Sequence, residues 1–215
     1  MLSARDITKT YRGQRVLDGA TLACDSGQVC AVLGENGTGK STLLRILSGM
    51  LEPDRGTVSI QGHPLGGGGV EARRRLGYVP DGTDSLPDLS LHEFITLVRS
   101  LKQLRPDLDR ERELFGWRER LGLTSAWHQR LGTLSFGQRK RACLLAALSG
   151  DPWLLILDEP SNGLDPAGVA LMVGLIEQRR QQAKATLLAS NDMPFVQLLV
   201  AQRLRLHAGR VTPDV

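Results

Sequence analysis

The chain has few aromatic residues, few cysteines and no apolar stretch of the roughly 20 residues that a membrane-spanning helix needs. Aromatic side chains make up 4% of its 215 residues and no RNA-recognition motif occurs, so we expect no nucleic-acid partner. Its three cysteines, Cys24, Cys30 and Cys143, lie in apolar runs without metal-ligand spacing. Because three is an odd number, they argue against a disulfide framework, and we expect reduced core thiols with no disulfide partner.

Basic residues are scattered, and no long basic tract occurs. The formal net charge is +4, with short clusters at residues 73–75, 139–141 and 179–180. We interpret these clusters as solvated faces that can attract phosphate groups or a lipid surface.

Strand-like and helix-like segments alternate along the chain, which is typical of an α/β fold with a mostly parallel sheet. The pattern changes near residue 82, since Ser90 and Glu93 form a capping box before a run of helical periodicity. We therefore predict one domain, residues 1–215, in which 82–148 form a helical insertion in a core of 1–81 and 149–215. Strands are expected at 2–10, 16–24, 28–33, 56–60, 75–79, 153–157 and 185–190, helices at 41–47, 109–121, 137–148 and 166–182, and a flexible loop at 66–69.

A glycine-rich segment separates the apolar run 28–33 from the helical run 41–47. It matches Gly-x4-Gly-Lys-Ser, whose glycines let several backbone N–H groups point at one phosphate while the lysine adds a positive charge. The serine offers its hydroxyl to Mg²⁺, and the helix N-terminus favours an anion. The segment predicts a nucleoside triphosphate site made of Gly34, Glu35, Asn36, Gly37, Thr38, Gly39, Lys40, Ser41 and Thr42.

Two carboxylates end the apolar run 153–157. Asp158 suits a direct or water-mediated contact to Mg²⁺ opposite Ser41. Glu159 is expected to point elsewhere and to act as a general base that polarises water against the γ-phosphate. Acids at a strand end often only cap the next turn, but a phosphate loop requires such an acid.

The segment Leu134-Ser135-Phe136-Gly137-Gln138 lies about two dozen residues before the acidic strand. With it, the chain resembles the ATPase subunits of ATP-binding cassette (ABC) transporters, whose signature is Leu-Ser-Gly-Gly-Gln. Residues 161–166 resemble the dimer-contact loop of that family, and the resemblance covers almost the whole chain. It implies a P-loop NTPase fold of ABC type with an N-terminal antiparallel β subdomain.

The resemblance also assigns residues to the ligand, with ATP and Mg²⁺ as substrate and cofactor. It implies that Ser135, Gly137 and Gln138 meet the γ-phosphate held by an opposite subunit. Tyr11, followed by Val16, falls where the family places an aromatic ring that stacks on adenine. A lone tyrosine in a strand is otherwise more often a core residue.

Two positions depart from the family pattern. The family commonly has Gln, near Mg²⁺ and its water, where this chain has Asp81, whose carboxylate can still accept a hydrogen bond from metal-bound water. The family has His, near the γ-phosphate, where this chain has Asn191. Asn191 can donate an amide N–H but cannot carry a positive charge, and losing such a contact typically costs on the order of 10²–10³ in turnover. Three readings stay open: a slow ATPase, a weak half of a heterodimer, or a binding switch. Because Glu159 is present, we predict slow but real hydrolysis.

The resemblance further implies a second ABC ATPase subunit, identical or related, and a separate integral-membrane transporter subunit. We accordingly expect a peripheral protein on the cytoplasmic face of the cell membrane. Segments 86–94 and 162–168 look most like exporters of drugs, antibiotics or polysaccharides, and the ATPase subunit of a haem exporter is a second possibility. The alternative is an ABC protein that is not tied to transport.

Overall fold

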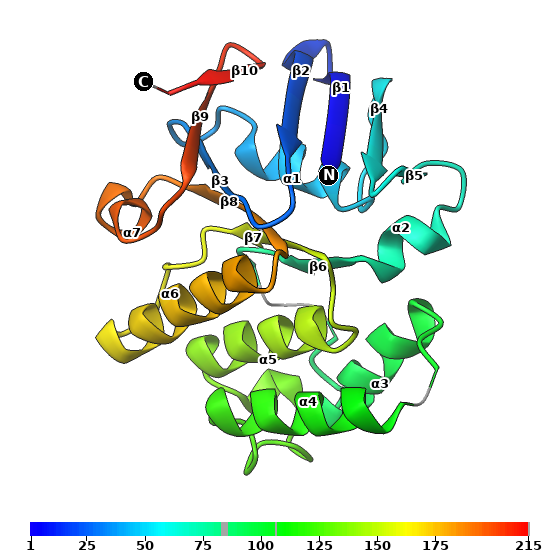
Figure 1. Cartoon of the computed structure of the whole chain (residues 1–215), viewed down its shortest axis with the longest axis vertical. Coiled ribbons are helices and arrows are strands. Elements are labelled where there is room, and N and C mark those ends of the chain that lie inside the picture. Colours follow the sequence, from blue (N-terminus) through cyan, green and yellow to red (C-terminus); the bar gives the residue numbers. More distant parts are fainter. Residues whose placement is uncertain (83–85, 106, 215) are drawn as a thin grey trace.

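A computed structural model describes residues 1–82, 86–105 and 107–214. Figure 1 shows two sheets stacked above a layer of helices, with both chain ends near the upper sheet. The division into an upper β part, a central sheet and a lower helical part follows the predicted fold class.

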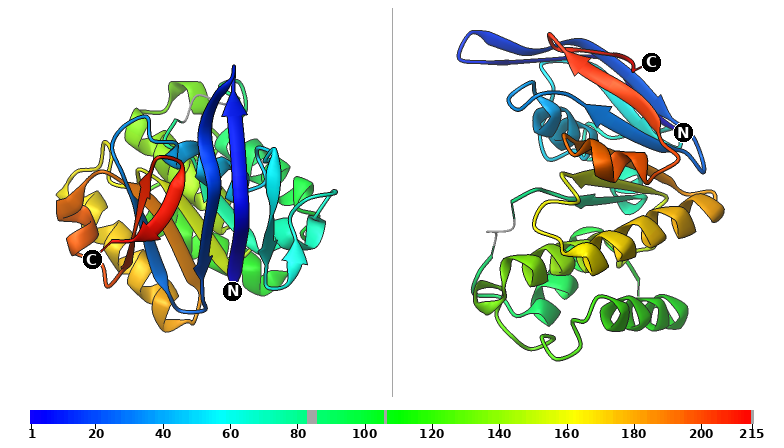
Figure 2. Two further views of the ribbon diagram at one scale, coloured as in Figure 1. Left: turned by 90° about the horizontal axis from the view of Figure 1, so that it is seen from above. Right: turned by 90° about the vertical axis from the view of Figure 1, so that its left-hand side faces the viewer.

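The upper sheet is antiparallel and comes from the first third of the chain (Figure 2). Leu2 pairs with Cys24 on one side and with Ile60 on the other, which fixes the register of three strands. The fourth, a two-residue strand, was not predicted, because so short a run carries no periodicity. The strand order is β2 (Gln14–Cys24), β1 (Leu2–Tyr11), β4 (Arg55–Ile60) and β5 (His63–Pro64).

The central sheet is parallel except for its last strand, β10, which pairs antiparallel with β9. Every residue of β3, β7 and β8 is buried, as expected for strands covered on both faces. The strand order is β10 (Arg210–Pro213), β9 (Gln202–His207), β3 (Val29–Leu33), β8 (Ala185–Ser190), β7 (Leu154–Asp158) and β6 (Leu76–Val79).

Helix α1 (Lys40–Leu47) fills the space between the two sheets. Its side chains Leu43 and Leu47 join a buried cluster that contains Leu2 of the upper sheet and Val32 of the central sheet. Alternate residues of β3 face opposite ways, so Ala31 belongs to a second cluster below the sheet. Helix α1 therefore packs against the upper sheet on one side and the central sheet on the other.

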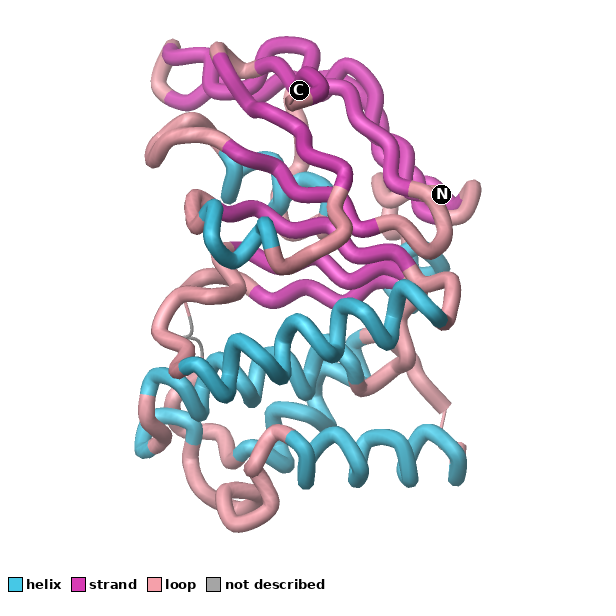
Figure 3. Tube along the Cα trace, turned by 60° about the vertical axis from the view of Figure 1, so that its left-hand side comes forward, coloured by secondary structure: helices cyan, strands magenta, loops and turns pink. Residues whose placement is uncertain are grey.

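Helices cover the lower face of the central sheet (Figure 3). The predicted capping box is confirmed, since the Ser90 hydroxyl accepts a hydrogen bond from the Glu93 backbone N–H at 3.2 Å. None of the helices formed by the described residues has the length and apolar character that a membrane crossing needs. The helices on this face are α3 (Leu91–Leu101), α4 (Leu108–Arg120), α5 (Phe136–Leu148), α6 (Pro166–Gln181) and α7 (Met193–Gln197), with a 3₁₀ turn at Leu131–Thr133. The short helix α2 (Val70–Arg74) instead places Ala72 in the cluster between the two sheets.

The helical part continues directly into the core. One buried cluster contains Ile95 and Trp117 of the predicted insertion together with Leu155 and Leu188 of the central sheet. A Cβ atom on Gly77 of β6 would lie 2.5 Å from the Ala147 carbonyl oxygen, so α5 and β6 touch through their backbones. The boundaries at residues 82 and 148 remain our proposal for the subdomains.

Two of the basic clusters contain buried members, so the expectation of solvated faces is wrong for those residues. Lys140 is 2% exposed and Arg179 is 3% exposed. The Arg179 guanidinium donates to the carbonyl oxygens of Pro152 at 3.0 Å and Ala185 at 3.2 Å. A charged group at such a position satisfies backbone acceptors at strand ends, which sequence clustering does not reveal.

Candidate active site

The glycine-rich loop lies between the end of β3 and the start of α1. Gly39 is the residue before the helix and has φ 102°, in the left-handed region that favours glycine. A Cβ atom there would lie 2.7 Å from the Val16 Cγ1 atom. The sequence therefore needs glycine at this position, and Val16 of β2 lies directly against the loop, as the predicted site requires.

Lys40 folds back over the loop. The residue is 6% exposed, and its Nζ atom donates to the carbonyl oxygens of Gly34 at 2.7 Å and Glu35 at 3.1 Å. The Thr38 hydroxyl also donates to the Glu35 carbonyl, at 2.9 Å. These hydrogen bonds fix the backbone of the phosphate loop and keep the Lys40 ammonium group against it.

Three strand ends bring the other predicted residues to the same edge of the sheet. Leu33 pairs with Ser190, and Asp158 pairs with Ala189, in parallel registers. The loops that follow β3, β7 and β8 therefore start side by side, which is where open α/β sheets bind ligands.

Asp158 is buried beside the first turn of α1. Its carboxylate oxygen Oδ1 has no hydrogen-bond partner among the described residues. Burial raises the pKa of Asp158 above its usual value, and the neighbouring Ser41 hydroxyl acts in the opposite direction. An unpartnered carboxylate oxygen beside a serine hydroxyl fits a hard divalent cation such as Mg²⁺.

Glu159 turns away from Asp158 and faces the loop after β8. Its backbone has φ 45°, unusual for a residue with a side chain, and its N–H donates to the Ala189 carbonyl at 2.9 Å. The carboxylate accepts from the Asn191 backbone N–H at 3.2 Å and lies 3.8 Å from the Lys40 Nζ atom. Burial raises the pKa of Glu159, a change that makes a carboxylate a stronger base.

Asn191 joins this group through its side chain as well. The side-chain nitrogen Nδ2 donates to Oδ1 of Asn36 at 3.0 Å, so the loop after β8 is bonded to the phosphate loop. The structure thus brings together Asn36, Lys40, Asp158, Glu159 and Asn191.

Asp81 lies two residues after the end of β6. It accepts a hydrogen bond from the Asn162 side-chain amide at 3.2 Å, and its oxygen lies 4.0 Å from the Lys140 Nζ atom. The side chain remains 46% exposed. A role toward metal-bound water stays a prediction for Asp81.

Lys140 is the residue that sequence reasoning missed. Its Nζ atom donates to the carbonyl oxygens of Glu159 at 2.5 Å and Asn162 at 3.0 Å. Its position five residues after Ser135, inside a basic cluster, gave no sign that it points into the protein.

The signature segment begins α5. Ser135 caps the helix, because its hydroxyl accepts from the Gln138 backbone N–H at 3.2 Å and its own N–H donates to the Gln138 side chain at 2.9 Å. Gln138 is therefore occupied with its own helix cap. Ser135 and Phe136 are exposed and Gly137 is half-buried, so this helix end is accessible from outside the chain.

Tyr11 is the last residue of β1 and is 42% exposed. The alternative that it is a core residue is wrong, and adenine stacking stays a prediction. Of the remaining predicted residues, Glu35, Asn36 and Gly37 are exposed, and Gly34, Thr38, Ser41 and Thr42 are half-buried.

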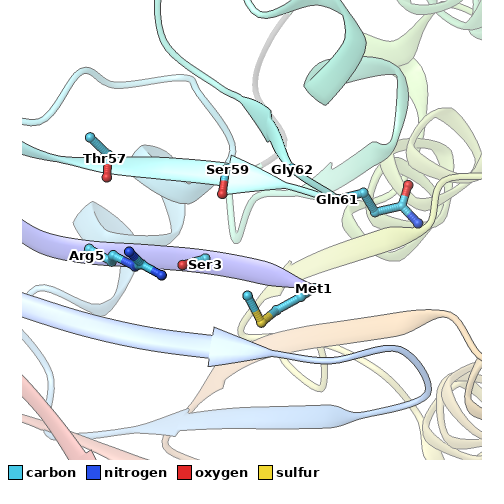
Figure 4. Close-up of a pocket in the computed structure, with 7 residues that line it drawn as sticks. All are labelled: Met1, Ser3, Arg5, Thr57, Ser59, Gln61 and Gly62. Atoms are coloured by element: carbon cyan, nitrogen blue, oxygen red, sulfur yellow. The ribbon is translucent and has the colours of Figure 1, made fainter.

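A hollow on the outer face of the upper sheet is shown in Figure 4. Ser3 and Arg5 of β1 and Thr57 and Ser59 of β4 line it, together with Met1, Gln61 and Gly62. It contains none of the predicted site residues and does not contribute to the candidate active site.

The family model described as ABC transporter matches residues 17–162, which include the phosphate loop, the signature and both carboxylates. The chain belongs to the ABC transporter family. It is an ATP-binding cassette of this family, a class of ATPases, and the predicted resemblance is confirmed.

Relatives of this ABC cassette include proteins named for opposite directions of transport. A phosphonates import ATP-binding protein, PhnC of Wolinella succinogenes, is 31% identical over 100% of this chain and 82% of its own. The Nod factor export ATP-binding protein I of Burkholderia pseudomallei is 31% identical over 96% of this chain and 67% of its own. The predicted export direction is therefore not decided by relatedness.

Solved structures agree with the fold of the cassette. The ATP-binding subunit of an ABC transporter superposes with a TM-score of 0.90 at 28% identity, covering 98% of this chain and 88% of the other. The dimeric structure of the bacterial ABC transporter cassette MJ0796 has a TM-score of 0.84 at 22% identity, covering 98% and 96%. The second likeness concerns the fold alone.

Proposed function

We propose that this chain binds ATP between two cassette subunits, hydrolyses it slowly and powers a separate membrane-spanning subunit. The observation that carries the proposal is the position of the Glu159 carboxylate, 3.8 Å from the Lys40 ammonium and bonded to the Asn191 backbone. A base beside the lysine of a phosphate loop is where water can be turned toward a γ-phosphate.

In the proposed reaction each residue has one task. Tyr11 stacks on adenine, and the loop amides with Lys40 bind the phosphates. Ser41 and Asp158 would hold Mg²⁺, which neutralises phosphate charge when bound. Glu159 accepts a proton from the attacking water, and Asn191 donates an amide hydrogen toward the γ-phosphate.

A second cassette would complete the site. Its Ser135 and Gly137 are exposed or half-buried at a helix N-terminus, where backbone N–H groups and the helix dipole favour an anion. Closure of two cassettes is then favoured by contacts that exist only with ATP bound, and hydrolysis removes them.

We further propose export as the direction of transport and the cytoplasmic face of the membrane as the location. The support is the resemblance of residues 86–94 and 162–168 to exporters. Purification from detergent extracts tests the transport role, since a tightly bound integral-membrane subunit is expected. Recovery of ribosomal or nucleic-acid material instead would favour an ABC protein outside transport.

ATP turnover by the purified chain and by Glu159→Gln tests the enzymatic proposal. We expect the substitution to lower kcat by about 10²-fold or more while ATP binding is kept, because the amide cannot accept the proton. Equal and negligible rates in both proteins would contradict it.

A weakly catalytic half of a heterodimer is the second candidate, and the Asn191–Asn36 hydrogen bond favours it. An amide engaged with Asn36 at 3.0 Å is less available to a phosphate. Mixing the chain with a second cassette from the same membrane complex and measuring turnover would separate the two candidates.

A further inference from the structure

Lys140 is a buried lysine whose ammonium group contacts three residues beside the candidate site. The ammonium group donates to the Glu159 and Asn162 carbonyl oxygens, at 2.5 and 3.0 Å, and lies 4.0 Å from the Asp81 carboxylate. The side chain is 2% exposed. We name this set of contacts the lysine bridge.

The position of the lysine is unusual for a residue that only fills space. An uncharged side chain of similar length would fill the same buried space beside α5 without the free-energy cost of removing an ammonium group from water. The charge is instead placed against two carbonyl oxygens of one short loop, and one of them belongs to Glu159, whose φ is 45°. A backbone in that region needs external support to persist.

We propose that Lys140 is a positioning residue for ATP hydrolysis, holding the Glu159 backbone so that its carboxylate faces Lys40 and Asn191. The inference rests on the proposed function of Glu159 as the base. It also connects two sites, because Ser135 caps the same helix five residues earlier. A rigid helix transmits a displacement of the signature, caused by nucleotide on the opposite subunit, to the Glu159 carbonyl and to Asp81.

Lys140→Met and Lys140→Gln separate hydrogen bonding from shape. Methionine fills the space and cannot donate, whereas the glutamine amide keeps two donors. We expect Met to lower kcat by about tenfold or more with KM within about twofold, since misplacing a catalytic group acts on the chemical step. We expect Gln to restore kcat to within about threefold of the unmodified protein.

Lys102→Met is the matched control. Lys102 is half-buried and, like Lys140, donates to a backbone carbonyl, that of Leu76 at 2.7 Å, but it lies at the end of α3. The control should leave kcat within about twofold. A Lys140→Met protein with normal kcat would overturn the inference. So would changes in kcat and KM that are no larger than those of Lys102→Met.

Hydrogen exchange at the Asn162 amide gives a readout that needs no turnover. This N–H donates to the Glu159 carbonyl at 3.2 Å, the same oxygen that Lys140 holds. Its exchange should be at least about tenfold faster in Lys140→Met and unchanged in Lys102→Met. If the unmodified chain does not hydrolyse ATP, the proposed function fails, while faster exchange still supports the bridge. Unchanged exchange overturns the bridge whatever the turnover.

Discussion

The side-chain amide of Asn191 donates a hydrogen bond to the Asn36 side chain at 3.0 Å, and this bond joins the loop after β8 to the phosphate loop. The same residue holds the Glu159 carboxylate through its backbone N–H. Asn191 therefore contacts both the proposed base and the loop that would hold the γ-phosphate.

Asn191→His should raise kcat by about tenfold or more. An imidazole can carry a positive charge toward the γ-phosphate, and a preorganised contact of this kind is typically worth on the order of 10²–10³ in rate. Steady-state ATP turnover measures the effect. Asn36→Ala is the control, because it removes the asparagine bond without adding an imidazole. An equal gain in both proteins would show that release of Asn191, not its charge, limits the rate.

Gly39→Ala should abolish ATP binding and destabilise the fold by about 1–3 kcal/mol. The new Cβ atom would lie 2.7 Å from Val16 Cγ1 at a residue whose φ is 102°. Gly37→Ala is the matched control, since its φ is 81° and no atom lies within 4 Å of the added carbon. It should cost only about 1 kcal/mol for the backbone. Urea unfolding and nucleotide titration measure both effects, and equal losses would contradict the steric explanation.

Tyr11→Ala should weaken ATP binding by about three- to tenfold and leave the unfolding temperature unchanged. The ring is 42% exposed, so its removal opens no core cavity, while a lost stacking contact is worth about 0.5–1.5 kcal/mol. Tyr11→Phe keeps the ring and should bind normally. A drop in stability without a change in affinity would mean that the ring serves only packing.

The stability of the folded chain should rise between pH 7 and pH 10 through Lys102. Burial lowers its pKa to about 8, below the ordinary value of about 10.4, so the unfolded chain binds more protons across this interval. The free energy of unfolding then increases with pH, by roughly 2–3 kcal/mol for this group. Urea unfolding of the unmodified protein and of Lys102→Met at pH 7 and pH 10 isolates the contribution of Lys102 to the free energy of unfolding. A difference between the two proteins that is independent of pH would contradict the assignment.

Local periodicity and residue spacing were enough to predict several elements of the fold and the phosphate loop. Continuous apolar runs predicted the buried strands β3, β7 and β8, and Ser90 with Glu93 predicted the start of α3. The phosphate loop could be located because its glycine and lysine requirements are local to one turn. Such features need no knowledge of what lies across the fold.

Which distant residues meet, and which charges are buried, could not be predicted from the chain alone. Lys140 and Arg141 are neighbours in a basic cluster, yet Lys140 is 2% exposed and bonded to a loop that begins 19 residues later. The Asn191–Asn36 bond joins residues 155 positions apart. Contacts of this range follow from the order of strands in a sheet, and no pattern along one segment carries that order, because burial depends on what the rest of the chain brings beside it.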